Sequence, residues 1–226
     1  MLPELDQQTL KHRIARRIAM EFQDNDLVNL GIGIPTLVSD YIADDLNIVF
    51  QTENGVIGAG PKPEKDDWRF IGAGGRCVTL QDGAVLVSSE FSFGMIRGGH
   101  LDHTVLGALQ VDSDANLASW WIPGKLVPGM GGSMDLVTGV KNVIVATSHL
   151  NKSGAPKIVE RCDFPLTGVG VVDMIVTEYA VMRFIDGRLT LCEAAPGVSV
   201  DDLKEATGAD FIVDENLICM KGCENE

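Results

Sequence analysis

The sequence predicts an α/β fold in which a mixed sheet is flanked by helices, and three patterns support this prediction. Short apolar runs of strand length recur along the chain between polar turns. Two early runs end in turns that contain glycine, as do many strands that lead into ligand-binding loops of α/β sheets. Two late runs are joined by an Asp-Gly pair, a strong hairpin signal. We therefore expect parallel strands early in the chain and antiparallel strands late.

The first expected element is an amphipathic helix over residues 10–22. Apolar side chains recur there at every fourth position, and Lys and Arg occupy much of the remaining surface. A solvated face is the main interpretation of these basic residues, and contact with a phosphate or a partner is the alternative.

Two units of strand and turn follow this helix. Residues 26–30 form a short apolar run that ends in the glycine turn of residues 31–35, and residues 36–41 are expected to form a helix. Residues 47–51 then run as a second strand into residues 52–55, which read Thr-Glu-Asn-Gly. Both units place a turn at the carboxyl end of a strand, where clefts lie in open α/β sheets.

The rest of the chain continues in strand-length segments. The next expected strands cover residues 77–80, 84–88, 104–111 and 142–147. Residues 181–192 should form two strands of a hairpin, and a helix over residues 200–207 should precede a last strand at residues 211–213. The sequence contains no internal repeat or linker, so residues 1–226 are expected to form one domain.

Composition narrows the class of protein. Hydrophobic residues make up 45% of the chain and charged residues 22%, as in a compact soluble domain. The formal net charge of −14 argues against nucleic acid as a partner. The sequence shows neither a secretory signal nor an apolar stretch that could cross a bilayer, so we expect a cytoplasmic protein without membrane association. An anionic ligand would have to be captured by backbone N–H groups and a few placed cations.

Metal binding has weak support in the sequence. The five cysteines are odd in number and lie mostly in apolar runs, which predicts reduced, buried thiols; Cys219 and Cys223 lack companion ligands for a metal. His100, Asp102 and His103 form a short cluster, but alternation along a strand would direct His103 to the opposite face from the other two. No metal site is therefore expected.

The most informative feature is a glutamate, Glu53, that ends an apolar strand and is followed by Asn54 and Gly55. Asn and Gly both tolerate positive φ, so the chain can turn sharply there and lift Glu53 out of the sheet edge. From the spacing alone, an acid that stabilises a turn or caps a helix is the alternative to a catalytic carboxylate.

Two further glycine clusters are candidate ligand-binding segments. Gly98 and Gly99 close one apolar segment, and Gly129, Gly131 and Gly132 follow a Pro-Gly-Lys sequence. Such glycines let a ligand approach the backbone and expose N–H donors for an oxyanion or an amide. Ordinary tight turns are the alternative for each cluster.

Two common enzyme classes are disfavoured. The chain has no G-x-S-x-G elbow for a Ser-His-Asp hydrolase. The glycine turn that begins at Gly31 has Thr36 where the third glycine of a G-x-G-x-x-G motif would stand, which argues against a nicotinamide enzyme.

Five segments carry a resemblance to a known family: VNLGIGIPTLV, QTENGVIGAG, IRGGHLDHTVLGALQVD, ANLASWWIPGKLVPGMGGSMDLVTG and TEYAVMRFIDG. Together they resemble the β (B) subunit of family I coenzyme A-transferases over nearly the whole chain, especially acetate/butyrate–acetoacetate and bacterial 3-oxoacid CoA-transferases. The Ser-Glu-Asn-Gly signature of that family reads Thr-Glu-Asn-Gly here, which keeps the hydroxyl and the carboxylate. The Gly-Gly-Phe segment of the α (A) subunit is absent, so the resemblance implies a separate α subunit in a heterotetramer or larger assembly.

The resemblance implies a CoA-transferase fold, related in architecture to some phosphosugar isomerases. It makes Glu53 the nucleophile that attacks a short-chain acyl-CoA and carries CoA as a thioester before passing it to a carboxylic acid. CoA is then a substrate, and no prosthetic group is implied. The residues that would line the thioester site are Gly31, Gly33, Asn54, Gly55, Gly98, Gly99, Gly129, Gly131 and Gly132.

Two other functions remain as alternatives. On the same fold, an acyl-CoA hydrolase would use Glu53 to direct water; a non-catalytic scaffold that binds CoA or a phosphosugar would not use its carboxylate chemically. Trp120 and Trp121 are candidates for shaping an acyl pocket, and packing in the core or against a partner chain is their alternative role.

Overall fold

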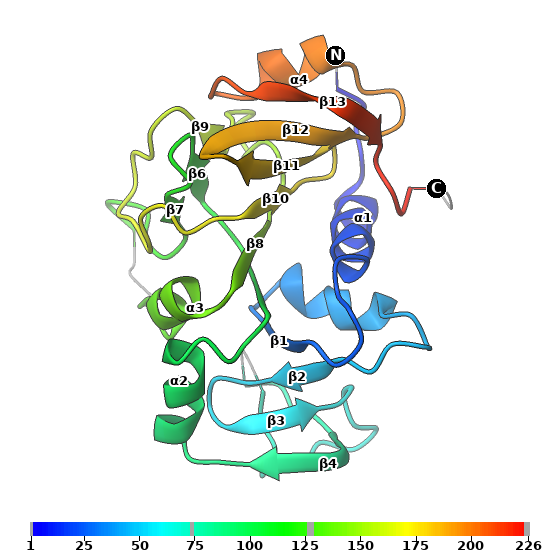
Figure 1. The fold of residues 1–226 in the computed structure, drawn as a ribbon, viewed down its shortest axis with the longest axis vertical. Coiled ribbons are helices and arrows are strands. Elements are labelled where there is room, and N and C mark those ends of the chain that lie inside the picture. The colour runs from blue at the N-terminus through cyan, green and yellow to red at the C-terminus, as the bar shows by residue number, and fades with distance from the viewer. Residues whose placement is uncertain (1, 73–74, 126–128, 224–226) are drawn as a thin grey trace.

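The structure is a computed structural model that describes residues 2–72, 75–125 and 129–223. Its helices are α1 (Gln7–Ala19), α2 (Ser89–Arg97), α3 (Ser133–Gly139), α4 (Val200–Ala206) and the 3₁₀ helix η1 (Pro35–Tyr41). Its strands are β1 (Leu27–Leu30), β2 (Val49–Gln51), β3 (Val56–Ala59), β4 (Leu80–Leu86), β5 (His103–Leu106), β6 (Gln110–Asp112), β7 (Leu117–Ala118), β8 (Asn142–Ala146), β9 (Ile158–Val159), β10 (Met174–Val176), β11 (Ala180–Ile185), β12 (Arg188–Ala194) and β13 (Ile212–Cys219). Figure 1 shows their arrangement.

A mixed sheet organises the described residues. Its ten strands lie in the order β13-β12-β11-β10-β8-β5-β1-β2-β3-β4, and β7, β6 and β9 form a separate small sheet. The strands β2, β1, β5, β8 and β10 pair in parallel, so their carboxyl ends share one edge. Antiparallel strands continue the sheet on both sides, through β3 and β4 at one end and β11 and β12 at the other.

The mixed sheet is confirmed, but the expected division into early parallel and late antiparallel strands is wrong at both ends of the chain; the last strand, β13, pairs in parallel with β12. The late hairpin forms as expected, and its turn residues Asp186 and Gly187 both have positive φ. Antiparallel pairing was expected only late in the chain, yet β2, β3 and β4 already form an antiparallel meander near its beginning.

Two layers of helices cover opposite faces of the sheet (Figure 1). On one face, Ile14 of α1 belongs to the same buried cluster as Ile144 of β8. On the other face, Ile96 of α2 and Leu136 of α3 belong to a cluster with Val143, the neighbour of Ile144 in the same strand. Because successive side chains of a strand point to opposite faces, α1 and η1 lie on one side of the sheet and α2 and α3 on the other.

The basic side chains of the first helix correct the prediction of a solvated face. Arg13 and Arg17 are buried. The Arg17 guanidinium lies 2.6 Å from carboxylate oxygens of both Glu21 and Glu193, which ties α1 to β12. These arginines therefore bind within the chain.

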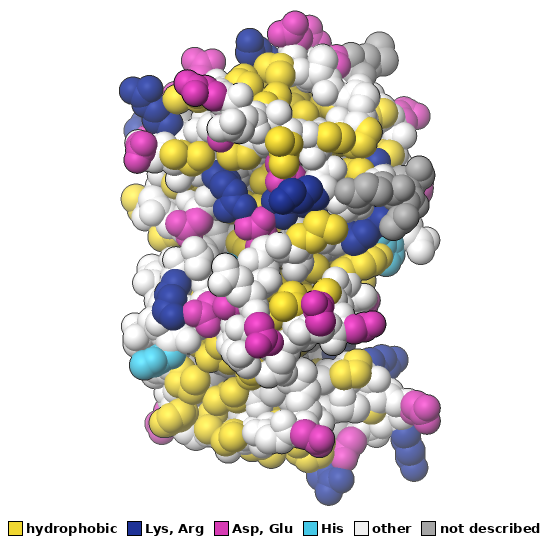
Figure 2. Space-filling model, turned by 45° about the vertical axis from the view of Figure 1, so that its right-hand side comes forward, with side chains coloured by type: hydrophobic (Ala, Val, Ile, Leu, Met, Phe, Trp, Pro, Cys, Tyr) yellow, Lys and Arg dark blue, Asp and Glu magenta, His cyan; other side chains and the backbone are white. Residues whose placement is uncertain are grey.

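The surface drawn in Figure 2 carries charges of both signs. Asp and Glu side chains lie beside those of Lys and Arg over most of the height of this face, and apolar side chains separate many of them. A protein that binds nucleic acid usually presents a broad basic patch or stripe instead. The described residues of the face drawn in Figure 2 show no such basic patch.

The structure shows where the cysteines and the histidine cluster lie. None of the five cysteines forms a disulfide in the described residues; Cys77 and Cys223 are buried, whereas Cys219 is exposed. His103 lies 3.2 Å from an Asp26 oxygen at the amino end of β5. Among the described residues, no group of three or more His, Cys, Asp or Glu side chains is arranged to hold a metal.

None of the helices in the described residues is long and apolar enough to span a membrane.

Candidate active site

Glu53 lies in the turn that joins β2 to β3. The Gly55 N–H donates to the Thr52 carbonyl at 3.0 Å, and the Thr52 N–H donates to the Val56 carbonyl at 2.8 Å. Glu53 and Asn54 thus occupy the centre of a tight hairpin turn that Gly55 closes with a φ of 114°. The sequence predicted a strand that runs into a turn here; after the turn the chain reverses into β3, which pairs back on β2.

Gly55 holds this hairpin in contact with Val87, in the segment that leads into α2. Its carbonyl accepts a hydrogen bond from the Val87 N–H at 2.9 Å. A Cβ atom at Gly55 would lie 2.1 Å from the Val87 carbonyl oxygen, so only glycine fits. The close approach fixes the position of Glu53 relative to the helix that follows Val87.

The side chains on either side of Glu53 hold the turn. The Thr52 hydroxyl donates to Asn54 Oδ1 at 2.6 Å and accepts from the Val56 N–H at 3.0 Å. The Asn54 amide donates to the Ile71 carbonyl at 2.6 Å. Threonine therefore supplies the hydroxyl that shapes the turn.

A buried polar chain beneath the turn was missed by sequence reasoning. Gln51 Nε2 donates to Ser92 Oγ at 2.6 Å, and Ser92 Oγ donates to the Thr52 carbonyl at 3.2 Å. Asn29 Nδ2 donates to Gln51 Oε1 at 2.8 Å. Asn29, Gln51 and Ser92 are almost fully buried. Their signal was a polar residue inside an apolar segment, which requires hydrogen-bond partners when it is buried.

The Glu53 carboxylate itself is free for chemistry. Within residues 2–72, 75–125 and 129–223, no hydrogen bond or ion pair engages it. The residue is half-buried, and this burial raises the pKa of its carboxyl group. A carboxylate that is partly desolvated and lacks a cationic partner is more reactive as a nucleophile than one held in an ion pair.

Gly132, which immediately precedes α3, borders Glu53. A Cβ atom at Gly132 would lie 3.8 Å from the carboxyl carbon of Glu53 and 2.9 Å from the Phe93 ring. Gly129 and Gly131 adopt positive φ values of 91° and 55° just before it. The absence of a side chain at Gly132 leaves the position beside the carboxylate free, whereas no contact among the described residues places Gly129 or Gly131 beside Glu53.

Gly31 and Gly33 follow β1 and lie at the same sheet edge as Glu53. β1 pairs in parallel with β2, so the carboxyl ends of both strands meet there. The Gly31 N–H donates to the Val105 carbonyl at 2.8 Å, and a Cβ atom at Gly31 would lie only 3.0 Å from that oxygen. Gly33 has a φ of 95° and open space around it.

Gly98 and Gly99 lie at the other end of the helical layer. Gly99 approaches Gly139, the last residue of α3, whereas Gly132 immediately precedes that helix. A seven-residue helix is about 10 Å long, so a helix length separates these glycines from Gly132. Their role in ligand binding stays a prediction.

Trp120 and Trp121 pack together with ring centroids 5.7 Å apart. The Trp120 indole donates to the Leu166 carbonyl at 3.3 Å, and that of Trp121 to the Lys125 carbonyl at 3.4 Å. These contacts give both rings a packing role within the chain.

Comparison with known proteins places the chain in a family. Residues 11–206 match the family model for coenzyme A transferase. The chain is 51% identical over 219 residues to the β subunit of the acetate CoA-transferase of Haemophilus influenzae, covering 95% of this chain and 98% of that one. It is 44% identical over 210 residues to the B subunit of the probable succinyl-CoA:3-ketoacid coenzyme A transferase of Bacillus subtilis, covering 92% and 97%.

A solved structure shares the fold. The acyl-CoA transferase apoenzyme of Escherichia coli O157:H7 superposes with a TM-score of 0.77 at 22% identity. The match covers 98% of this chain and 45% of that one, so this chain spans less than half the length of that enzyme. From the matched family model and the extent of the likeness to its relatives, the chain belongs to the coenzyme A transferase family.

Proposed function

We propose that this chain is the nucleophile-bearing subunit of a CoA-transferase and that Glu53 carries CoA during each turnover. The observation that carries the proposal is the Glu53 carboxylate, half-buried, unengaged among the described residues and presented by a rigid hairpin at the carboxyl edge of the parallel strands. The family supplies the reaction class, transfer of CoA between an acyl-CoA and a carboxylic acid.

The proposed chemistry needs only the carboxylate of Glu53 and the two substrates. A Glu53 oxygen attacks the thioester carbonyl of the acyl-CoA, CoA leaves as a thiolate, and a mixed anhydride forms. The thiolate then attacks the glutamyl carbonyl, which forms a glutamyl-CoA thioester and releases the first acid. A second carboxylate reverses these steps and leaves as its own CoA ester. Both half-reactions exchange bonds of similar energy, so the proposal includes no prosthetic group.

The surrounding residues of this chain protect and stabilise these intermediates in the proposal. Thr52, Asn54 and Gly55 hold the turn, so that Glu53 keeps its position while its carboxyl group forms first the anhydride and then the thioester. Backbone N–H groups of Gly131 and Gly132 are the proposed donors to the tetrahedral oxyanion, because that segment borders the carboxyl carbon of Glu53. Partial burial of the site limits access of water to the anhydride.

The relatives suggest the substrates and the partner. Their names specify acetate and 3-ketoacid CoA-transferases and describe the matching chains as β or B subunits. We propose acetate, butyrate and acetoacetate as the class of acids, a separate α subunit as the partner in a heterotetramer or larger assembly, and a cytoplasmic enzyme. If the isolated chain catalysed full turnover without an α subunit, the proposed heteromer would be wrong.

Trapping the covalent intermediate tests the proposal directly. The assembled enzyme is incubated with acetoacetyl-CoA or butyryl-CoA without an acceptor acid, reduced with borohydride, digested and examined by peptide mass spectrometry. We expect the glutamyl thioester at Glu53 to be reduced to the alcohol, and no such change in Glu53→Gln.

An unmodified Glu53 peptide from an enzyme that turns over would contradict the proposal. Release of free CoA at a rate independent of the acceptor acid would indicate the acyl-CoA hydrolase instead. Adding the second acid before the reduction should remove the signal.

The first half-reaction should depend on pH in a direction set by Glu53. Only the carboxylate attacks, and burial raises its pKa above the ordinary glutamate value of about 4.3. We expect the rate of thioester formation to fall as pH decreases, with a midpoint above that ordinary value. Single-turnover kinetics at saturating acyl-CoA would measure the midpoint. A midpoint below the ordinary value would indicate a carboxylate stabilised by cations and would contradict the environment described.

A further inference from the structure

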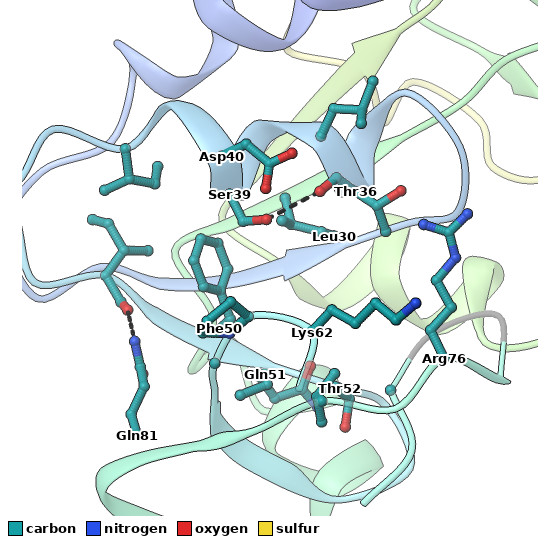
Figure 3. A pocket seen from close by; sticks show the side chains of 18 of the residues that line it. Leu30, Thr36, Ser39, Asp40, Phe50, Gln51, Thr52, Lys62, Arg76 and Gln81 are labelled. Carbon is teal, nitrogen blue, oxygen red and sulfur yellow. Dashed lines mark hydrogen bonds between the residues drawn. The ribbon is translucent and has the colours of Figure 1, made fainter. Parts of the chain in front are cut away.

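A cavity of about 510 Å³ lies between η1, β2 and the segment that joins β3 to β4. Figure 3 shows it from close by. Its volume falls in the range of about 300–1,000 Å³ that is usual for small-molecule sites. Apolar side chains, among them Leu37, Ile42 and Phe50, line the cavity together with polar ones such as Thr36, Ser39 and Gln51.

This cavity and the Glu53 side chain lie on opposite faces of β2. Thr36, Leu37 and Ser39 of η1 line the cavity, which places it on the side of the sheet covered by α1 and η1. The carboxyl carbon of Glu53 lies beside Gly132, the residue just before α3 on the other side of the sheet. Gln51 and Thr52 also line the cavity, so it reaches the residue before Glu53, but Glu53 itself is not among its lining residues.

Two cations stand at the mouth of the cavity. The side chains of Lys62 and Arg76 end on the same side of the cavity, near Thr36 in the view of Figure 3. Among the described residues, no carboxylate lies within ion-pair distance of either cation. Asp40 of η1 also lines the cavity, and Figure 3 shows it on the far side from Arg76.

Two cations beside apolar side chains favour a ligand that has both an anionic group and an apolar part. The chain carries a net charge of −14, so its surface as a whole repels anions. Two cations that lack a partner in the described residues and converge over an apolar space provide charge-assisted hydrogen bonds for an anionic head. The wall beneath them provides hydrophobic burial for a hydrocarbon chain.

We propose that this cavity is a second ligand site and that it takes a carboxylate with an apolar chain. Lys62 and Arg76 hold the carboxylate, and the chain lies along Leu37, Ile42 and Phe50. The site is separate from the acyl site at Glu53, and its existence does not depend on the function proposed for Glu53.

Photoaffinity labelling of the assembled enzyme locates the ligand. The probe is octanoate with a diazirine at the end of its chain, and labelled residues are identified by peptide mapping. We expect label in the peptides that contain η1 and Phe50, whether or not saturating CoA is present. In the double variant Lys62→Gln, Arg76→Gln, labelling should fall by at least about tenfold, because both charge-assisted contacts are lost.

A matched variant controls for general charge effects. Lys65→Gln removes an exposed cation of the same segment that does not line the cavity, and it should leave labelling unchanged. Label in the peptides that contain Phe93 or Gly132, loss of label with CoA, or equal labelling of the double variant and the unaltered enzyme would each overturn the proposal. All three substituted side chains are exposed, so folding is expected to be retained.

Discussion

Replacing Glu53 with Gln is expected to abolish CoA transfer, with a fall in kcat on the order of 10⁴-fold or more. Gln keeps the size and shape of the side chain, but its amide is too weak a nucleophile to form the anhydride. The measurement is CoA transfer from acetoacetyl-CoA to acetate by the assembled enzyme. Glu64→Gln removes an exposed glutamate further along the chain and should retain activity.

Stability measurements separate this loss from misfolding. Burial raises the pKa of Glu53, so the folded chain binds that proton more tightly than the unfolded chain does. The free energy of unfolding therefore falls as pH rises through the window between the ordinary and the raised pKa. Glu53→Gln removes the free-energy cost of burying a charged carboxylate. At neutral pH we therefore expect this variant to be at least as stable to urea as the unaltered chain. Marked destabilisation would instead assign Glu53 a structural role.

Gly55→Ala is expected to destabilise the chain by roughly 2–5 kcal/mol and to lower activity. The new methyl carbon would lie 2.1 Å from the Val87 carbonyl oxygen, and this backbone atom cannot rotate away as a side chain could. The φ of 114° adds strain for any residue with a Cβ. Relief requires movement of the hairpin that presents Glu53. Urea unfolding and kcat would measure the two effects.

Gly83→Ala is the matched control for this substitution. Gly83 also has positive φ, 82°, but a Cβ atom there meets no other atom within 4 Å. It should therefore cost only the backbone strain, about 1 kcal/mol, and leave catalysis intact. Equal destabilisation by both substitutions would show that the contact with Val87 does not fix the turn.

Local signals in the sequence were enough to predict the fold class and most strands. The hairpin of β11 and β12 was predictable because its Asp-Gly turn lies within the segment itself. The reversal after β2 was only partly predictable: the Asn-Gly pair marked a turn, but pairing with β3 decided that a strand follows. Short apolar segments do not by themselves distinguish these outcomes.

The buried polar residues near Glu53 were missed because their contacts join residues that are far apart in the sequence. Glu53, Asn54 and Gly55 are consecutive, so one motif was enough to make them candidates. Gln51 meets Ser92 from 41 residues away, and that pairing depends on how α2 packs on the sheet. The burial of Arg17 likewise depends on Glu193, which lies 176 residues along the chain.

The way the hairpin is held has a consequence for the identity of the atoms in Glu53. In the proposed cycle, the departing acid takes away an oxygen that began on the glutamate, and the incoming acid leaves one of its own behind. The hydrogen bonds that fix the turn come from Thr52, Asn54 and Gly55, and in the described residues none uses a Glu53 oxygen. The protein can therefore renew part of its own side chain at every turnover while the turn stays in place.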